Sequence, residues 1–306
     1  MTDSLLDRSA PCRLCPRQCG VARDADRGSG FCAMGTDAVV ARAALHLWEE
    51  PCISGTRGTG AVFFSGCTLQ CCYCQNWCIS HEGEGQRVSA RQLADIFRRL
   101  VDEGAHSLSL ITATQFLPAI LEALSLYRPR VPVVYNCGGF ERVEVVRALA
   151  DAVDVWLPDI KNHSPRLSKL LLGRGDYFQA ASAAVRQMCA LSGPPQYDAQ
   201  GIMTRGTLVR HLVIPGCATD SIQVLRFIAD ELPPGTPLSL MRQYTPIPQC
   251  TVPGLDRRVT EAEYRRVLRA ALDLGLTGYL QDAESADSAY TPPFDGTGVP
   301  GKTKRQ

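Results

Sequence analysis

Short apolar runs alternate with longer stretches of helical hydrophobic period along most of the chain. We expect strands at residues 61–65, 108–111, 131–135, 153–157, 208–214 and 238–241, each followed by a helix. Such repeated strand–helix units predict parallel strands joined by right-handed crossovers. About six to seven units indicate an α/β barrel, complete or partial. A doubly wound open sheet would produce the same alternation, so this pattern alone leaves both architectures open.

Two of the expected helices carry clear start signals. Ser89 is followed by Gln92, and Thr260 by Glu263, and both pairs have the spacing of a capping box. Apolar residues then recur on one helical face, and a glycine ends each pattern at positions 104 and 275. We therefore predict helices within residues 89–104 and 260–275.

The composition excludes several classes of protein. The chain has 306 residues, enough for one large domain with a small appendage, and its 32 lysines and arginines nearly balance 31 aspartates and glutamates. No strong field therefore draws it to nucleic acid or to an anionic membrane. There is no signal-peptide pattern, and no apolar run approaches the ~20 residues that span a bilayer. We expect a soluble, cytoplasmic protein.

The fourteen cysteines add a chemical constraint. In a reducing compartment, closely spaced cysteines are more often ligands of metals or clusters than partners in disulfides. We divide the chain into a cysteine-rich metal-binding segment at residues 1–55, a barrel domain at 56–285 and a polar tail at 286–306. Within the barrel, residues 193–206 are rich in glycine, proline and polar side chains, which predicts an insertion loop.

The strongest motif directly follows the first expected strand. Cys67, Cys71 and Cys74 are spaced C-x3-C-x2-C in a loop at the carboxyl end of that strand, where barrel enzymes place their chemistry. Three thiolates on a four-iron cluster would leave one iron free to bind another molecule. The alternative is a zinc site or a set of unrelated buried thiols. We interpret the neighbouring Cys72 and Cys78 as packing residues.

This spacing, with Tyr73 before the last cysteine, resembles the signature of the radical S-adenosylmethionine (SAM) superfamily. The resemblance implies a partial (β/α)6 barrel of the TIM type, in which a [4Fe–4S] cluster binds SAM through its open iron. An electron from a donor such as flavodoxin or ferredoxin would then cleave SAM to methionine and a 5′-deoxyadenosyl radical. This radical abstracts hydrogen from a substrate, so the chain would be an oxidoreductase.

Several further segments extend the resemblance over residues 10–282, where the chain is most similar to the group related to pyruvate formate-lyase activating enzymes. They are residues 12–21, 50–60, 64–76, 135–140, 156–161, 210–216 and 239–244. This group implies abstraction of hydrogen from a glycine of a partner protein or peptide. Two alternatives remain open, namely radical modification of a small metabolite and a non-catalytic metal-binding or electron-carrying protein.

The same resemblance implies further cofactor-binding residues. Tyr73 would lie near the adenine of SAM. Polar residues at later strand ends would surround its ribose and methionyl group, namely Asn136, Asp159, Lys161, Arg210 and His211. A buried core position is the competing interpretation for His211, and a surface ion pair is the competing interpretation for Asp159 and Lys161.

One segment departs from the pattern of the activating enzymes. These enzymes grip the amine of SAM with a Gly-Gly-Glu motif after the second strand, whereas this chain reads ITATQF at residues 111–116. Thr112, Thr114 and Gln115 could take over this role with hydroxyl and amide groups and backbone carbonyls. Their alternative role is to cap the end of the strand.

A second cysteine motif precedes the barrel. Four cysteines are spaced C-x2-C-x3-C-x12-C, namely Cys12, Cys15, Cys19 and Cys32. Their thiolates fit either a tetrahedral zinc ion or a second iron–sulfur cluster, and unligated thiols are the third alternative. Because the ferredoxin-type inserts of some activating enzymes lie elsewhere in the chain, the position favours zinc. We expect Arg17, within this motif, to be solvated.

Overall fold

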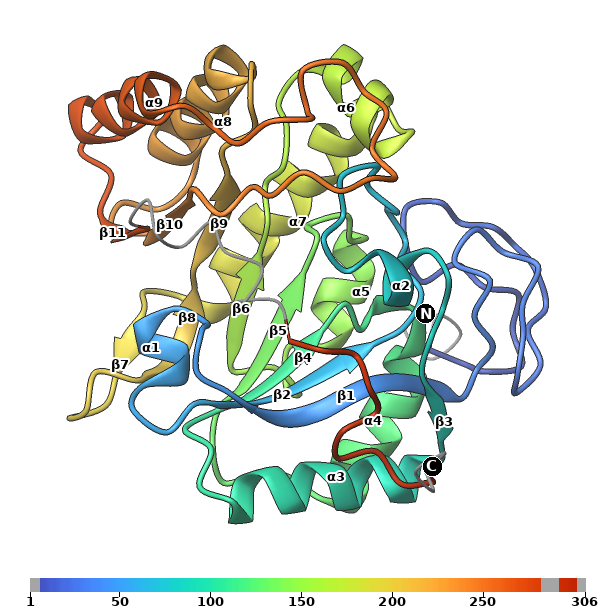
Figure 1. Cartoon of the computed structure of the whole chain (residues 1–306). Helices are drawn as coiled ribbons and strands as arrows, with labels where there is room; N and C mark the ends of the chain where they lie inside the picture. The colour runs from blue at the N-terminus through green and yellow to red at the C-terminus, as the bar shows by residue number, and fades with distance from the viewer. Residues whose placement is uncertain (1–5, 282–291, 302–306) are drawn as a thin grey trace.

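A computed structural model describes residues 6–281 and 292–301, with strands in the centre and helices around them (Figure 1). The strands are β1 (Ala38–His46), β2 (Thr59–Phe64), β3 (Gln86–Val88), β4 (Leu108–Ile111), β5 (Val133–Cys137), β6 (Val155–Pro158), β7 (Gln196–Tyr197), β8 (Met203–Thr207), β9 (Val209–Leu212), β10 (Leu238–Met241) and β11 (Gly278–Leu280). The helices are α1 (Pro51–Ser54), α2 (Trp77–Ser80), α3 (Ala90–Asp102), α4 (Leu117–Leu126), α5 (Val143–Ala148), α6 (Pro165–Leu172), α7 (Tyr177–Ser192), α8 (Ala218–Glu231) and α9 (Glu261–Asp273), with a 3-10 turn at Thr114–Phe116.

Two sheets form the centre of the molecule. The larger has the order β3-β1-β2-β4-β5-β6-β8-β7, in which β2, β4, β5, β6 and β8 are parallel neighbours and β1 is antiparallel to β2. The smaller sheet is parallel, with the order β11-β10-β9. A parallel bridge between Asp159 and Arg210 joins the end of β6 to β9. The parallel strands β2, β4, β5, β6, β9 and β10 thus follow one another in chain order.

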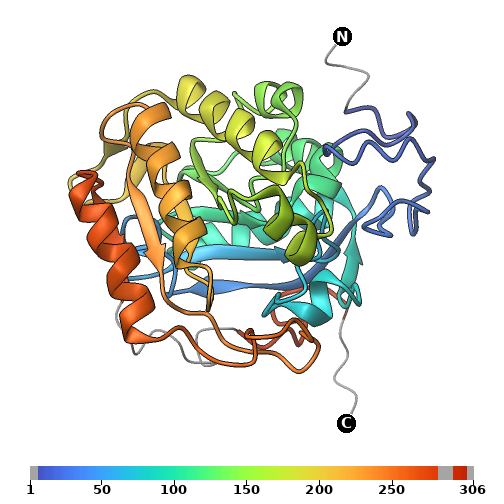
Figure 2. The same ribbon diagram turned by 90° about the horizontal axis from the view of Figure 1, so that it is seen from above.

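This arrangement confirms the predicted α/β fold with parallel strands, and it is an open series of strand–helix units. The helices coloured from green to orange-red follow the outer rim of the molecule when it is seen from above (Figure 2). Each of the six predicted strands is present, with bounds shifted by a few residues. The predicted insertion loop is wrong in its second half, because β8 pairs with β6 in the sheet. Polar side chains and a glycine in MTRGT concealed this strand.

Both predicted capping boxes are confirmed. At α3, the Ser89 hydroxyl accepts from the Gln92 amide at 3.2 Å, and Gln92 Oε1 accepts from the Ser89 amide at 2.9 Å. Thr260 and Glu263 form the same reciprocal pair at α9. These bonds satisfy amides that would otherwise lack partners in the first turn, so each helix begins where the sequence predicts.

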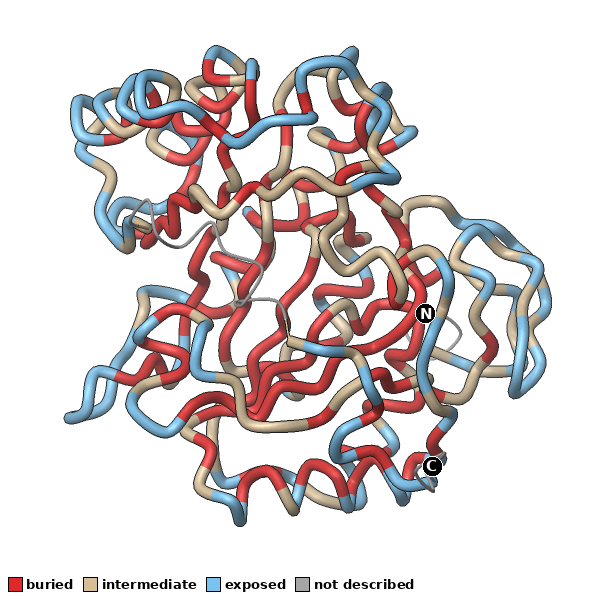
Figure 3. The backbone as a smooth tube through the Cα atoms, viewed as in Figure 1, coloured by how far each residue is buried: buried red, intermediate tan, exposed pale blue. Residues whose placement is uncertain are grey.

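Burial follows the strands and the inward faces of the helices (Figure 3). In α3 the buried side chains include Leu93, Phe97 and Leu100, which share one core cluster with Val62 and Leu110 of the sheet. This helix therefore packs its apolar stripe against β2 and β4. Within residues 6–281 and 292–301, every helix is too short or too polar to cross a bilayer.

The first described residues form a lobe at one side of the sheet, and the last described residues pack along β1. Residues 6–37 contain no helix and form a lobe at one side of the sheet, which we call the N-terminal lobe (Figure 1). Residues 292–301 run along β1, where the Ala43 amide donates to the Thr297 carbonyl at 2.9 Å and Val299 is buried. The rest of the predicted tail, 286–291 and 302–306, lies outside the described residues. The predicted boundary at residue 55 falls after β1, and the division into domains stays a prediction.

One carboxyl group is buried in the core beneath the strand ends. Glu141 is only 2% exposed, and its Oε1 accepts from the hydroxyl of Thr114 at 2.7 Å. Burial raises the pKa of Glu141 to about 8, although hydrogen bonds from Thr114 and Tyr135 act in the opposite direction. The folded protein therefore holds this carboxyl protonated at neutral pH.

Glu141 should make the stability of the protein fall as the pH rises. The unfolded chain loses this proton near the ordinary pKa of 4.5, whereas the folded chain keeps it up to about 8. Between these values the folded state binds more protons, so the free energy of unfolding falls by up to about 1.4 kcal/mol per pH unit. Glu141→Gln removes this titration. Urea denaturation from pH 5 to 8 should give a flatter profile for the variant, and parallel profiles would contradict this account.

Candidate active site

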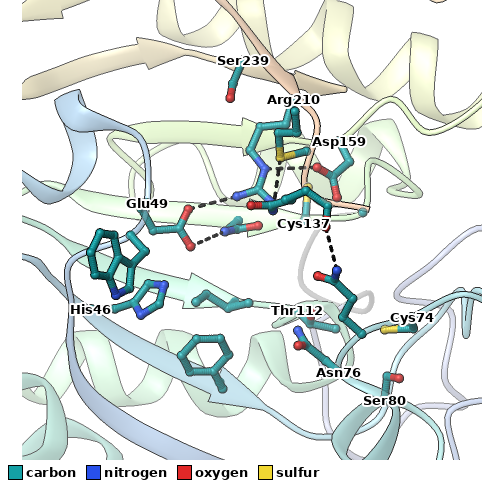
Figure 4. Close-up of a pocket in the computed structure, with 18 of the residues that line it drawn as sticks. His46, Glu49, Cys74, Asn76, Ser80, Thr112, Cys137, Asp159, Arg210 and Ser239 are labelled. Atoms are coloured by element: carbon teal, nitrogen blue, oxygen red, sulfur yellow. Dashed lines mark hydrogen bonds and ion pairs between the residues drawn. The ribbon is translucent and has the colours of Figure 1, made fainter. Parts of the chain in front are cut away.

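A cavity of about 550 Å³ lies where the carboxyl ends of the parallel strands meet. Its walls come from the segments that follow β2, β4, β5 and β6, from β9 and β10, and from residues 46–51 after β1. This volume is ordinary for a pocket that holds a cofactor or another small molecule. Figure 4 shows Glu49 and Asp159 pointing toward Arg210 across the cavity.

The three cysteines of the first motif all line this cavity. Cys71 is buried, whereas Cys67 and Cys74 are half-buried, and Cys67 Sγ accepts from the amide of Leu69 at 3.4 Å. Burial raises the pKa of Cys71, and the nearby thiols of Cys74 and Cys67 raise it further, against the effect of Lys161. A free Cys71 thiol would therefore be protonated at neutral pH, and a metal would have to hold it as a thiolate.

The donor set at this cavity is three cysteine thiols, and thiolates are the usual ligands of an iron–sulfur cluster. The neighbouring cysteines face elsewhere: Cys72 Sγ lies 3.9 Å from Cys250 Sγ, and Cys78 packs in an apolar cluster. Three thiols therefore share the cavity, and this leaves one iron of a bound cluster open.

Thr112 adopts a backbone conformation that β-branched residues rarely adopt. Its φ is +58°, and its amide donates to the carbonyl of Asn136 at 2.9 Å. This conformation costs roughly 1–2 kcal/mol for a residue other than glycine. Such strain persists where the surrounding structure enforces it, often at ligand sites. Thr112 lines the cavity at the point where the activating enzymes have their Gly-Gly-Glu motif.

The two other residues of this segment are engaged with the protein. Thr114 lines the cavity, but its hydroxyl donates to the buried Glu141. Gln115 does not line it, and its amide nitrogen lies 2.9 Å from the Ser65 carbonyl and 2.7 Å from the Thr112 carbonyl. Gln115 thus links the end of β2 to the end of β4, whereas Thr112 and Thr114 both line the cavity.

A network of charges forms the opposite wall. Arg210 Nε lies 3.1 Å from Asp159 Oδ1, and Lys161 Nζ lies 2.7 Å from Asp159 Oδ2. Burial opposes the ionisation of Asp159, but Lys161 and Arg210 outweigh burial and lower its pKa. The side chains of Asp159 and Lys161 are 14% and 19% exposed, so this pair lies in the cavity wall and not on the outer surface. Asn136 joins the network through Glu49, 3.2 Å away.

The sequence did not reveal the acidic pair Glu49 and Glu50. Glu49 Oε2 lies 2.9 Å from Arg210 Nη1, and Glu50 Oε2 is buried 3.9 Å from the same nitrogen. Burial raises the pKa of Glu49 to about 7, Arg210 opposes this effect, and Glu50 adds to it. The only signal was an adjacent pair of acidic residues before Pro51, in a segment that otherwise carried part of the family resemblance.

Tyr73 and His211 lie behind the wall of the cavity and do not line it. The ring of Tyr73 packs in the core, 6.1 Å from the ring of Tyr244. His211 is 1% exposed, and its Nδ1 lies 2.7 Å from the Ile160 carbonyl, so Nδ1 carries the proton. His211 Nε2 has no hydrogen-bond partner among the described residues. The adenine-binding and ribose-binding roles of these residues stay predictions.

A second, smaller cavity lies in the N-terminal lobe and is lined by the other predicted ligands, Cys12, Cys15, Cys19 and Cys32. Burial raises the pKa of Cys15 to about 12. Arg17 is half-buried and not simply solvated, since its Nε donates to the carbonyl of Thr68 at 2.5 Å. Thr68 follows Cys67 directly, so the lobe contacts the loop of the first cysteine motif.

Comparisons with known proteins agree with this geometry. The sequence profile of the radical SAM superfamily matches residues 61–215. An uncharacterized protein of Methanocaldococcus jannaschii is 27% identical over 273 residues, which cover 85% of this chain and 74% of that protein.

Two solved structures align with large parts of this chain. A radical SAM methyltransferase from Sphaerobacter thermophilus aligns with a TM-score of 0.50 and 15% identity, over 73% of this chain and 66% of its own. A domain of a pyruvate-formate lyase-activating enzyme from Bacteroides vulgatus aligns with a TM-score of 0.38 and 13% identity, over 63% of this chain and 91% of its own.

The profile spans half of the chain and includes the strand ends that surround the larger cavity. It also includes all three cysteines that line that cavity, at the spacing that provides three thiolates for a four-iron cluster. The chain therefore belongs to the radical SAM superfamily, whose members use a [4Fe–4S] cluster and SAM.

Proposed function

We propose that this protein cleaves SAM reductively and uses the resulting 5′-deoxyadenosyl radical to abstract hydrogen from a polypeptide. The observation that carries the proposal is the convergence of Cys67, Cys71 and Cys74 with polar strand-end residues on one cavity. A bound cluster would supply the electron for cleavage of SAM. A ferredoxin or flavodoxin would supply that electron to the protein.

The residues of the chain position the cofactor in this proposal. The three thiolates would hold the cluster at this cavity and would leave one of its irons without a protein ligand. Thr112, with its strained backbone, offers a hydroxyl and carbonyls to the methionyl amine of SAM. Lys161 lines the cavity and acts electrostatically on the Cys71 thiol, and it would pair with the methionyl carboxylate. Asp159 holds Lys161 in place and keeps its pKa high against the opposing effect of burial.

The rim of the cavity supports a polypeptide substrate. Leu47, Trp48 and Leu280 line the cavity, yet they are 52%, 59% and 55% exposed. Exposed apolar side chains at the mouth of a polar site are typical of surfaces that bind other proteins. A glycine of such a partner, as in the activating enzymes, is the candidate donor of hydrogen.

Cys71→Ala should abolish the release of 5′-deoxyadenosine. After anaerobic reconstitution and reduction with dithionite, the wild-type protein should release it from SAM. The variant should release at least about 100-fold less, because even the outer partners of metal ligands typically contribute 10–100-fold. Chromatography of the quenched reaction measures the product.

Cys72→Ala is the matched control, because Cys72 is adjacent in sequence but faces Cys250. It should retain most of the release. A fully loaded wild-type cluster that releases no 5′-deoxyadenosine would refute the radical function, and equal loss in both variants would refute the assignment of the three ligands.

Macromolecules should stimulate the cleavage of SAM more than small metabolites do. Anaerobic cell extract is separated by ultrafiltration, and each fraction is added to the wild-type protein. The retained fraction should raise the release of 5′-deoxyadenosine severalfold, and protease treatment should remove the effect. An electron paramagnetic resonance (EPR) signal of a glycyl radical in that fraction would identify the hydrogen donor.

Trp48→Ala should lower this stimulation more than the unstimulated release, because Trp48 lies at the rim of the cavity and is 59% exposed. Leu170→Ala provides the control, since Leu170 is equally exposed, at 58%, but lies on α6. Stimulation that resides only in the small-molecule filtrate would show that the substrate is a metabolite.

A further inference from the structure

The N-terminal lobe encloses a space between its cysteines. A cavity of about 20 Å³, room for about one water molecule, is lined by all four of them. The rest of its wall includes the apolar side chains of Leu14, Val21 and Phe31. Four thiolates bound to one zinc ion at about 2.3 Å would leave no such space between their sulfur atoms.

The backbone of the lobe is folded tightly around this cavity. The Cys12 amide donates to the Val21 carbonyl at 2.8 Å, and the Gly20 amide returns to the Cys12 carbonyl at 2.9 Å. Gln18 and Ala33 have positive φ values of 43° and 58°. Each of these residues adopts a conformation that residues other than glycine usually avoid. Local strain of this kind is typical of segments that clamp a ligand.

The lobe packs directly on the loop that holds the first cysteine motif. Arg17 donates to the carbonyls of Thr68 and Leu69, at 2.5 and 3.4 Å. A methyl group on Gly66 would meet the side chain of Met34 and, at 3.1 Å, the carbonyl of Cys32. Gly66, which directly precedes Cys67, therefore packs against the side chain of Met34 and the backbone of Cys32.

Positive charge accompanies the second group of cysteines. Arg17 and Arg23 both line the small cavity, and Arg23 is held by the carbonyl of Gln115 at 2.7 Å. Arg17 lies close enough to Cys15, Cys19 and Cys67 to interact electrostatically with their thiolate forms. A cluster ligated by four thiolates carries net negative charge, and these two cations would balance it.

We propose that Cys12, Cys15, Cys19 and Cys32 bind a second [4Fe–4S] cluster, through which electrons reach the cluster of the active site. The space that these four thiols line is larger than four thiolates on one zinc ion would leave, which favours a cluster over zinc. Cys19 is exposed and gives a donor protein access to this side. One electron passes from a reduced flavin or iron–sulfur protein to this cluster and then to the first cluster, and no atom is transferred.

The metal content of a variant without the first motif tests this proposal. The triple variant Cys67→Ala/Cys71→Ala/Cys74→Ala is reconstituted anaerobically with iron and sulfide, and iron, sulfide and zinc are measured per chain. It should hold about four iron and four sulfide, and the wild-type protein about eight of each. Mössbauer spectra should identify both sets as [4Fe–4S] clusters.

Either of two results would overturn the proposal. One is a triple variant that retains about one zinc per chain and no sulfide. The other is a wild-type protein that loads only about four iron after reconstitution. The wild-type measurement keeps the test decisive even where the triple variant does not fold. Since neither measurement involves SAM, the second cluster and the proposed radical function can fail independently.

Matched variants locate the second cluster. Cys12→Ser/Cys15→Ser should lower the iron of the wild-type protein from about eight to about four per chain. Cys52→Ala/Cys189→Ala is the control, because both residues are buried and neither lines either cavity, and its iron content should equal that of the wild-type protein. Equal loss of iron in both double variants would contradict the assignment.

Discussion

The buried guanidinium of Arg210 holds the two sheets and the cavity together. The backbone of Arg210 forms a bridge with that of Asp159, and this bridge joins β6 to β9. The side chain of Arg210 lies between the carboxylates of Asp159 and Glu49. The Arg210 side chain is only 16% exposed, and removal of one partner from such a buried pair costs about 3–5 kcal/mol. The wall of the cavity is therefore as rigid as the junction between the sheets.

Three parts of the chain meet at this junction. The segment after β1 provides Glu49, the parallel strands provide the polar residues at their carboxyl ends, and the loop after β2 provides the three cysteines. The N-terminal lobe supports that loop from behind through Arg17. A site for radical chemistry needs such support, because its cofactor must be held in one orientation while its reactive product is kept away from water.

Much of the fold could be predicted from local patterns. The capping boxes at Ser89 and Thr260 and the short apolar runs depend on neighbouring residues, so the sequence reveals them directly. The strand β8 escaped prediction, because MTRGT lacks a clear apolar pattern and is stabilised by its pairing with β6. The antiparallel strand β1 was placed in the N-terminal segment although AVVARAALH is mostly apolar, because only its pairing with β2 makes it part of the sheet.

The residues of the candidate site likewise divide into those that the local sequence reveals and those that only tertiary structure brings together. The cysteines could be found because thiol spacing within one loop is a local property, whereas Glu49 reaches Arg210 only through tertiary structure, across 161 positions. The position of Arg17 between two cysteine groups likewise depends on the docking of the lobe. Tyr73 and His211 were chosen by resemblance, and their side chains lie behind the cavity wall.

The central claim is that Cys67, Cys71 and Cys74 hold a four-iron cluster whose open iron binds SAM. The most direct measurement is the EPR spectrum of the reconstituted, dithionite-reduced protein before and after SAM is added. Coordination of the methionyl group to the open iron should shift the signal of that cluster, and Cys71→Ala should remove the shift. A spectrum that stays unchanged in the presence of saturating SAM would contradict the account.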